Sequence, residues 1–533
     1  IELQFDADLA GKPGFIVYQR DANGRRRPEV DYPQREPVNG RSVVLTIDQA
    51  YQSIAEEELQ RGVQNAAARS GRCVILQPRT GEILALANVP SIDPNDLSSY
   101  TSNEIANAKN RVVTDVYEPG STFKLVAMSA ALNEGLVKPD DVLDGNNGCW
   151  EYAPGQKPIR DEHGFGRISL RDAFIYSSNI ISAKLAERLG AERFYTYARN
   201  FGFGLRTGIE LPGEVRGELR KPTAWDGSTL KYLAFGYGLS ATSLQIACAY
   251  AAIANDGVLM QPFIRRWLLD EDRNIIEETT PQVIRRVVSS GTAATMRDFM
   301  RGVVERGTAT AAAIPGVDIA GKTGTSQRLV GDRYSSTSHV ASFVGFFPAS
   351  DPKILILVLL EEPKNGYYGG VVAAPVFRNI ALRIITSRPE FAPPARPVPE
   401  WIDTVRVPDL CGLHQEVAVV LARAYGLEVR TRGNGDVVCR QNPAPGNRSR
   451  RRETVTLDLA SAERGTPLVR VPDVTGIPVR RAAARLAASG LHASIAGSGV
   501  VFSQLPAAGE LLEHGAPCTL LAEPRRGSPV HVY

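Results

Sequence analysis

Two residues with the chemistry of an activated nucleophile lie three positions apart. Ser121 follows Glu118-Pro119-Gly120, and an apolar helical stretch begins at Phe123. Pro and Gly end the preceding segment, so we expect Ser121 at a helix N-terminus, with Lys124 on the same face one turn later. A serine hydroxyl needs a base to take its proton, and a buried neutral lysine can be that base. The spacing therefore indicates acyl transfer, with backbone N–H groups at the helix start available to an oxyanion.

A second polar group is the triplet Ser177-Ser178-Asn179. In an acyl-transfer site Ser177 can supply a hydroxyl relay and Asn179 a side-chain amide. Taken alone, the triplet is explained more simply as a helix N-cap or a turn, which Ser and Asn favour. His163, in the preceding DEHGFG segment, is interpreted as a structural loop residue.

The third motif is Lys322-Thr323-Gly324-Thr325, within a β-like stretch. Thr323 and Thr325 are two apart and share one face of a strand. Gly324 removes a side chain where a ligand backbone can lie against the strand. Two hydroxyls and one ammonium suit a carboxylate.

The third motif also matches a different pattern. Residues 316–323 read GVDIAGKT, which has the spacing of a nucleotide-binding P-loop. That reading needs a helix directly afterwards. Gly324 and Thr325 start helices poorly, and the next ordered stretch, Val340–Phe347, is strand-like. We therefore favour the carboxylate site over a nucleotide site.

The surrounding elements predict an α+β fold. Cys73–Val89 reads as a hairpin, residues 112–310 are mostly helical, and Val317–Leu360 returns to strands. This order predicts one antiparallel sheet, built from both ends of this region and covered by helices. The longest apolar run is Ile354–Leu360, far shorter than the roughly 20 residues of a membrane span.

The C-terminal part repeats itself after a Pro-rich stretch. Val407-Pro408-Asp409 recurs 64 residues later, and the QxPxxG pattern of Gln441–Gly446 recurs after 63. This period predicts two tandem small domains. Each is expected to form a strand, an Ala-rich helix (Val417–Ala424, Ala482–Ser489) and two further strands.

Bulk properties exclude little. The chain has 533 residues and a net charge of +3, so no nucleic-acid partner is indicated. Six cysteines occur without a CxxC pair, so no zinc site, metal or other cofactor is expected. A disulfide between Cys411 and Cys439 is one possibility. The simpler interpretation is that these cysteines are small hydrophobic residues.

The motif set resembles class B penicillin-binding proteins, over roughly residues 38–385. The stretches that carry the resemblance are LTID (45–48), YEPGSTFK (117–124), SSN (177–179), FGYG (235–238), AGKTGT (320–325) and FVGFFP (343–348). The C-terminal repeats resemble PASTA domains through VPDL, VPDV and the QxPxxG elements.

This resemblance implies a domain plan. Residues 1–37 would be the remnant of an N-terminal non-catalytic domain, 38–387 the transpeptidase domain with the serine β-lactamase-like fold, and 388–404 a linker. Two PASTA-like domains would follow, at 405–460 and 468–524. An N-terminal membrane anchor, absent from this chain, is expected to hold the catalytic domain outside the cytoplasm.

The resemblance also implies roles. Ser121 would be the acylated nucleophile and Lys124 its base, while Ser177, Asn179 and Lys322 would support proton transfer and docking. Thr323, Gly324 and Thr325 would hold the substrate carboxylate, with the N–H groups of Ser121 and Thr325 as the oxyanion hole.

The implied function is cross-linking of peptidoglycan, at division or sporulation. The expected partners are stem peptides ending in D-Ala-D-Ala, β-lactams, a polytopic membrane glycosyltransferase and division proteins. The alternatives are a D,D-carboxypeptidase or lactamase, which would pass the acyl group to water, and a receptor that only senses β-lactams or muropeptides.

Overall fold

The chain forms two units in its computed structural model. Residues 1–28, 33–106, 109–331, 333–388, 391, 404–450, 453–461 and 468–523 are described. One unit, here the body, is Ile1–Pro394, and the other, the repeat unit, is Ala395–Tyr533. Most of the predicted 388–404 linker lies outside the described residues.

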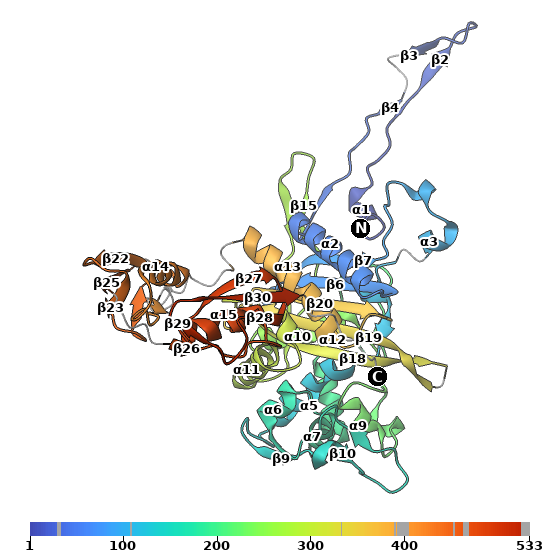
Figure 1. Ribbon diagram of the computed structural model, residues 1–533. Coiled ribbons are helices and arrows are strands. Elements are labelled where there is room, and N and C mark those ends of the chain that lie inside the picture. The colour runs from blue at the N-terminus through green and yellow to red at the C-terminus, as the bar shows by residue number, and fades with distance from the viewer. Residues whose placement is uncertain are drawn as a thin grey trace. The chain divides into compact units, whose positions relative to one another are not determined.

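A five-stranded antiparallel sheet is the centre of the body (Figure 1). Its order is β18-β19-β20-β6-β7, so strands from both ends of the region pair as predicted. The strands are β6 (Ser70–Leu76), β7 (Ile83–Val89), β18 (Ala320–Val330), β19 (Arg333–Phe347) and β20 (Ile354–Glu361). Every residue of β20 is buried, which explains its unbroken apolar sequence.

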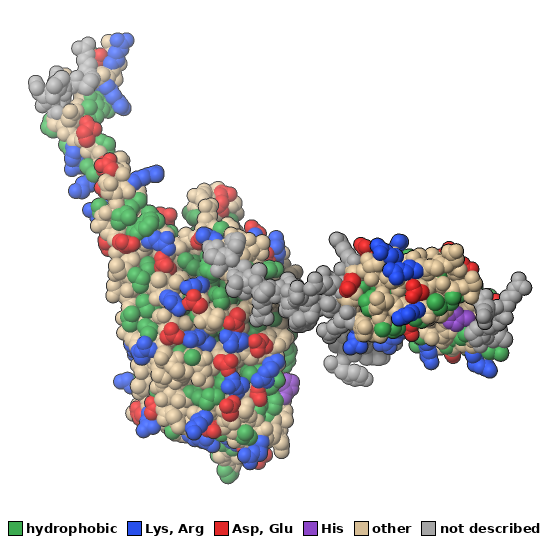
Figure 2. Space-filling model, turned by 90° about the vertical axis from the view of Figure 1, so that its left-hand side faces the viewer, with side chains coloured by type: hydrophobic (Ala, Val, Ile, Leu, Met, Phe, Trp, Pro, Cys, Tyr) green, Lys and Arg blue, Asp and Glu red, His purple; other side chains and the backbone are tan. Residues whose placement is uncertain are grey.

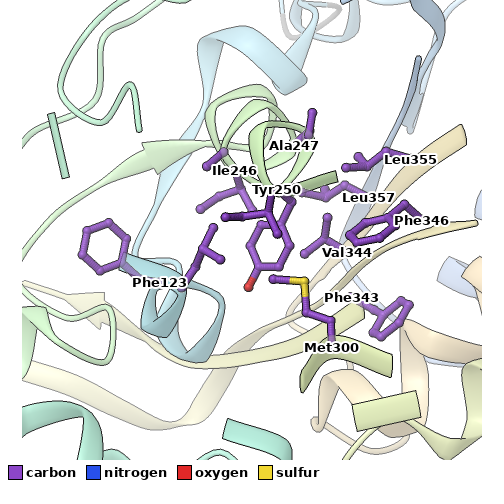
Figure 3. Packing of buried hydrophobic residues seen from close by; sticks show 14 of the residues in the cluster. Phe123, Ile246, Ala247, Tyr250, Met300, Phe343, Val344, Phe346, Leu355 and Leu357 are labelled. Carbon is purple, nitrogen blue, oxygen red and sulfur yellow. The ribbon is translucent and has the colours of Figure 1, made fainter. Parts of the chain in front are cut away.

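Helices cover both faces of this sheet. On one face, Tyr250 and Ile246 of α10 pack with Val344 and Leu357 (Figure 3). On the other, Phe377 of α13 meets Phe343 edge-on with ring centroids 4.8 Å apart. The covering helices are α2 (Gln49–Asn65), α10 (Ser243–Ala254), α11 (Ser290–Glu305) and α13 (Ala374–Ser387).

A helical lobe extends the body beyond the sheet. Its helices are α5 (Lys124–Asn133), α6 (Leu170–Ile175), α7 (Asn179–Leu189), α8 (Ala191–Asn200) and α9 (Thr229–Leu233). The body's short helices are α1 (Asp6–Leu9), α3 (Ser102–Ala106), α4 (Arg111–Thr114) and α12 (Gly369–Val372). The start of α5 and the start of α7 both carry motif residues.

The region 112–310 contains more strands than its sequence pattern predicted. β15 (Arg265–Leu269) pairs with β5 (Ser42–Leu45) and with β16 (Ile275–Glu278). The other pairs are β8 (Val116–Tyr117) with β13 (Ala241–Thr242), β9 (Val142–Asp144) with β12 (Arg167–Ser169), β10 (Cys149–Trp150) with β11 (Ile159–Arg160), and β14 (Val258–Met260) with β17 (Val283–Arg286). Such short strands depend on distant partners, which a local pattern does not reveal.

Two short strand pairs between Phe15 and Arg35 form an arm that projects from the body (Figure 1). β1 (Phe15–Ile16) pairs with β4 (Gln34–Arg35), and β2 (Tyr18–Arg20) pairs with β3 (Arg26–Pro28). Apolar side chains such as Ile16 are exposed on this arm.

The two repeats share one topology. The first holds β21 (Thr404–Arg406), α14 (Gln415–Ala424), β22 (Glu428–Arg432), β23 (Val437–Asn442), β24 (Arg448–Arg450) and β25 (Thr454–Ala460). The second holds β26 (Leu468–Arg470), α15 (Val479–Ala488), β27 (His492–Gly497), β28 (Val500–Leu505), β29 (Leu511–Glu513) and β30 (Pro517–Glu523). Each has more strands than predicted, and each helix begins earlier. The sheet orders are β22-β25-β23 and β27-β30-β28.

The glutamine of each QxPxxG pattern explains why it recurs. The Gln441 amide donates to the carbonyls of Pro408 (3.0 Å) and Pro443 (3.1 Å), and its oxygen accepts from the Leu410 N–H. Gln504 makes the matching bonds in the second repeat. One side chain thus ties the VPD segment to a strand about 30 residues later. Cys411 and Cys439 are both free thiols, so the structure does not contain the disulfide that the sequence allowed.

One helix among the described residues, Gly369–Ser387, is long and apolar enough to cross a membrane by length and composition. Its Phe377, Ile380 and Ile384 are fully buried in the body's core, which accounts for its apolar character. Positive and negative side chains intermix over the face of the body drawn in Figure 2.

Candidate active site

Ser121 lies where the helical lobe meets the sheet. It belongs to a 3₁₀ turn, Gly120–Phe123, that runs directly into α5. Gly120 has φ +55°, and a Cβ there would approach the Thr325 carbonyl oxygen to 2.7 Å. Only glycine therefore lets the nucleophile segment lie this close to β18. The hydroxyl of Tyr250 fixes the turn by donating to the Thr122 carbonyl (2.8 Å), and Figure 3 shows the Tyr250 ring beside the turn that carries Phe123.

Lys124 is fully buried beside the nucleophile. Its Nζ is 3.0 Å from Ser121 Oγ and 2.9 Å from Ser177 Oγ, and it also donates to the Ser177 carbonyl. The i, i+3 spacing predicted from the sequence therefore does place the amine on the serine hydroxyl.

Lys322 reaches the same point from β18. Its Nζ is 3.0 Å from Ser177 Oγ, and the side chain is fully buried. Ser177 has φ +64°, a left-handed backbone that is uncommon for serine and marks a locally strained position. This conformation leaves its hydroxyl between the two lysines, so Ser177 Oγ is the hub of the cluster.

Burial sets the protonation of both lysines. It lowers the pKa of Lys124 to about 7, although the carboxylates of Asp161 and Glu162 oppose the shift. Burial, together with the charge of Lys124, holds the pKa of Lys322 well below its usual value. Two ammonium groups that share one hydroxyl cannot both be charged cheaply without solvent. A neutral Lys124 near pH 7 is thus available as a general base.

The β18 residues occupy the edge of the sheet. Thr323 Oγ1 is 2.8 Å from Thr308 Oγ1, and Thr325 Oγ1 accepts from the Gly369 N–H (3.0 Å). A Cβ on Gly324 would meet Ser342 Oγ at 2.4 Å and Thr122 Cγ2 at 2.9 Å. The space that a side chain at position 324 would need is therefore filled by neighbouring protein, so packing alone already requires glycine there.

Asn179 is the least connected of the predicted site residues. Its side-chain amide donates to the Arg160 carbonyl (2.8 Å). Within the part of the chain that the structure describes, no hydrogen bond joins it to Ser121, Lys124 or Lys322. The simpler interpretation holds for its neighbour, because Ser178 is the N-cap of α7 and accepts from the Ile181 N–H.

Asp161 is a residue that sequence reasoning missed. One carboxylate oxygen accepts from the Asn179 N–H (2.5 Å), and the other accepts from the Ser178 hydroxyl (2.6 Å). It thereby fixes the start of α7 and, through Ser178, the turn that carries Ser177. It also faces Lys124 electrostatically. Asp161 is the first residue of the DEHGFG segment, of which only His163 was considered from the sequence, as a structural loop residue. His163 makes an edge-on contact with Phe165.

The alternative chemistries lose support from this geometry. GKT lies inside β18 and no helix follows it, which excludes the P-loop. Among the described residues, no group of three or more His, Cys, Asp or Glu side chains is placed to hold a metal ion. What remains is a serine, two buried lysines and a hydroxyl relay, which together can carry out acyl transfer.

Comparisons with known proteins agree with this chemistry. Residues 71–382 match the model of the penicillin binding protein transpeptidase domain, and residues 405–461 and 469–522 match the PASTA domain. The probable peptidoglycan D,D-transpeptidase PenA of Neisseria gonorrhoeae is 38% identical over 383 residues, which cover 71% of this chain and 63% of PenA. Stage V sporulation protein D of Bacillus subtilis is 32% identical over 467 residues, covering 84% of this chain and 70% of that protein.

Solved structures give the same result. Penicillin binding protein 3 of Mycobacterium tuberculosis, complexed with aztreonam, superposes with a TM-score of 0.63 at 36% identity. The match covers 68% of this chain and 82% of that one. The transpeptidase domain of Burkholderia pseudomallei penicillin-binding protein 3 gives a TM-score of 0.57 at 33% identity, covering 66% and 98%. The chain spans 63% of the length of the Neisseria gonorrhoeae relative.

Proposed function

Because the chain belongs to the penicillin-binding protein transpeptidase family, we propose that it is a serine D,D-transpeptidase that cross-links peptidoglycan stem peptides. The observation that carries the proposal is the cluster around Ser177 Oγ. Lys124 and Lys322 both reach that oxygen, and Lys124 Nζ is also 3.0 Å from Ser121 Oγ. A nucleophile, a buried base and a relay are thus in hydrogen-bond contact before substrate arrives.

In the first half-reaction, Ser121 Oγ attacks the carbonyl carbon of the penultimate D-Ala while neutral Lys124 takes its proton. The backbone N–H groups of Ser121 and Thr325 would stabilise the oxyanion. The C–N bond to the terminal D-Ala then breaks. The departing amine receives a proton from Lys124, by way of the Ser177 hydroxyl, and an ester to Ser121 remains.

In the second half-reaction, an amine of a neighbouring stem peptide attacks the Ser121 ester. The amine loses a proton through the same relay, the new amide bond forms, and Ser121 Oγ recovers its hydrogen. Earlier, before the C–N bond breaks, Thr323 and Thr325 would hold the terminal carboxylate of the donor peptide, and Lys322 would orient Thr323 through its contact with Thr323 Oγ1 (3.4 Å). The side-chain amide of Asn179 would bind an amide group of the peptide after its hydrogen bond to the Arg160 carbonyl breaks.

Transfer to water needs a carboxylate that can activate water on the ester. Three glutamates of the body already have partners: Glu187 pairs with Lys231, Glu210 accepts from the Ile264 N–H, and Glu214 accepts from Thr207. This arrangement favours transpeptidation over a lactamase.

The cellular setting follows from the substrate. Peptidoglycan lies outside the cytoplasmic membrane, so we place the body there, held by a membrane anchor. The relatives' names support a role in division or sporulation, with a glycosyltransferase and division proteins as partners. The PASTA repeats would contact the wall.

Labelling with a fluorescent penicillin, followed over time, tests the proposal. A stable label on Ser121, together with transfer of a donor peptide to an added amine acceptor, is the expected result. Rapid loss of label would indicate a hydrolase, and stable label without amine transfer would indicate a sensor. Absence of any label would overturn the assignment.

A further inference from the structure

The body has a groove that is lined by none of the acyl-transfer residues. It is a groove of about 860 Å³ between α8 and the loop 204–221. Its cationic lining residues are Arg199, Arg206, Arg216, Arg220 and Lys221, and its one carboxylate is Glu218. The excess of positive charge in this groove is larger than the net charge of +3 on the whole chain.

Most of these cations have no partner. Arg199 is used internally, because its Nη1 donates to the Gly204 carbonyl (2.7 Å). The side chains of Arg206, Arg216, Arg220 and Lys221 make no ion pair or hydrogen bond with any residue that the structure describes. All four are exposed. Like charges kept together without counter-charges leave a positive potential that favours an anionic partner.

The walls of the groove are fixed before anything binds. Gln245, fully buried in α10, donates its side-chain amide to the carbonyls of Leu205 (2.6 Å) and Arg216 (2.9 Å), one on each wall. Glu218 and Ser240 add two backbone hydrogen bonds to each other, of 2.9 and 3.0 Å. A preformed groove loses little conformational entropy on binding.

The groove is separate from the catalytic cluster but is joined to it by packing. Phe203, which precedes the wall residue Gly204, meets Phe123 with ring centroids 4.7 Å apart. Phe123 is two residues from the nucleophile. An occupant of the groove therefore lies one aromatic contact away from the Ser121 segment.

We propose that this groove binds a carboxylate-bearing strand of uncross-linked peptidoglycan, as a second contact besides the catalytic site. The inference rests on the proposed function, because that substrate is an anionic polymer that must be held while one peptide reacts. The volume is near the upper end for small-molecule sites, about 300–1,000 Å³, so it suits a polymer segment better than a single ion. Tyr195 and Leu219 give the lining an aromatic and an apolar side for sugar rings.

The test compares the full chain with the variant Arg216→Gln/Arg220→Gln/Lys221→Gln. A matched control, Arg20→Gln/Arg25→Gln/Lys364→Gln, removes equal charge from exposed positions of the body outside the groove. Fluorescence anisotropy measures binding of labelled uncross-linked strands at low salt. Because the triple variant loses three charge contacts, its affinity for the strands is expected to fall about tenfold. The affinity of the control variant should stay within about twofold of that of the unchanged chain. The single variant Arg206→Gln, on the other wall, should weaken binding by about twofold to threefold.

Two further probes identify the chemistry: the same strands with amidated carboxylates, and inorganic polyphosphate. Amidated strands should bind all variants equally weakly. The proposal would be overturned if the groove variants and the control variant bound strands with free carboxylates equally well. It would also be overturned if the groove substitutions weakened the binding of polyphosphate but not the binding of strands. Penicillin labelling of each variant is recorded separately. If the unchanged chain is not labelled by penicillin, the proposed function is contradicted. If the groove variants are labelled normally and bind strands as tightly as the unchanged chain does, only the proposal about the groove is contradicted.

Discussion

The body and the repeat unit bury polar side chains of different kinds. The body encloses Lys124 and Lys322 with no exposed surface and Arg72 with 1%, the last beside Glu361. In the repeats, the polar side chain that organises the core is an uncharged amide, Gln441 or Gln504. Burying a charge costs several kcal/mol even after relaxation, and a small core has little to offset that cost.

This difference indicates which unit can hold a catalytic site. Only the large core of the body can keep two amines desolvated and hold their pKa values low. The repeats use an uncharged amide for architecture alone: Gln441 is buried, and Gln504 makes the matching bonds from a half-buried position. The following predictions test this division, from the largest expected effect to the smallest.

Ser121→Ala should abolish covalent penicillin labelling of the full chain, because Ser121 Oγ contacts the buried base Lys124, whereas the other hydroxyl on Lys124, Ser177 Oγ, is held between two lysines. Circular dichroism should show an unchanged fold. Peptide mapping that found the acyl group on Ser177 or Ser326 would reassign the nucleophile.

Lys124→Ala should slow acylation by about 10²–10⁴-fold, the usual worth of general-base help, with a smaller change in initial binding. Stopped-flow mixing with a chromogenic β-lactam separates the two steps. In the unchanged chain the rate should fall as pH drops through about 7, since Lys124 becomes protonated there. An acylation rate near that of the unchanged chain would remove Lys124 from the mechanism.

Asp161→Asn should slow acylation by roughly tenfold, through loss of charge-assisted hydrogen bonds at the start of α7. The acid limb of the pH profile should also move to lower pH, because a carboxylate that raises the pKa of Lys124 is removed. Lys322, Glu162 and Asp161 are the charged groups facing Lys124 in this reasoning. Glu162→Gln is the matched control, which removes charge without touching α7. A slower rate with an unmoved acid limb would restrict Asp161 to a capping role.

Gln441→Ala should destabilise the first repeat by about 1–3 kcal/mol, because the Leu410 N–H loses its buried acceptor. Gln504→Ala should do the same in the second repeat. Calorimetry of the full chain should show the repeat transition shifted and the transition of the body unchanged. A matching loss of penicillin reactivity would break the proposed division.

Removal of residues 401–533 should change the acylation rate by no more than about twofold, because the motif residues all lie in the body and the repeats form a separate compact unit. Binding to isolated cell wall is expected to weaken. A large drop in acylation, with the body still folded, would show that the repeats act on the catalytic site.

Much of this site was predictable from local sequence. The Ser121–Lys124 spacing predicted their contact, and the hairpin and the apolar run at Ile354–Leu360 predicted the three neighbouring strands β20, β6 and β7. The approach of Lys322 to Ser177 was not derivable from strand alternation, and only the family resemblance indicated it. That contact joins residues 145 positions apart.

What the sequence did not reveal depends on distant partners. β15 is a strand because β5 offers it an edge more than 200 residues earlier. Asp161 matters because α7 presents its N–H groups to that carboxylate, and no pattern around residue 161 encodes this. The close packing of Gly324 against Thr122 was not predictable for the same reason, since Thr122 lies on another segment.

The place of β18 at the border of the sheet has a consequence for selectivity. An edge strand presents backbone donors and acceptors that have no strand on one side, so an extended peptide can join it as an additional strand. A peptide held in this way is recognised by its main chain and by the stereochemistry that sets its direction. Its side chains point alternately away from the sheet plane and contribute little to the ladder. Variation in the third or second residue of the stem would then be tolerated, whereas inversion of a terminal D-alanine would not.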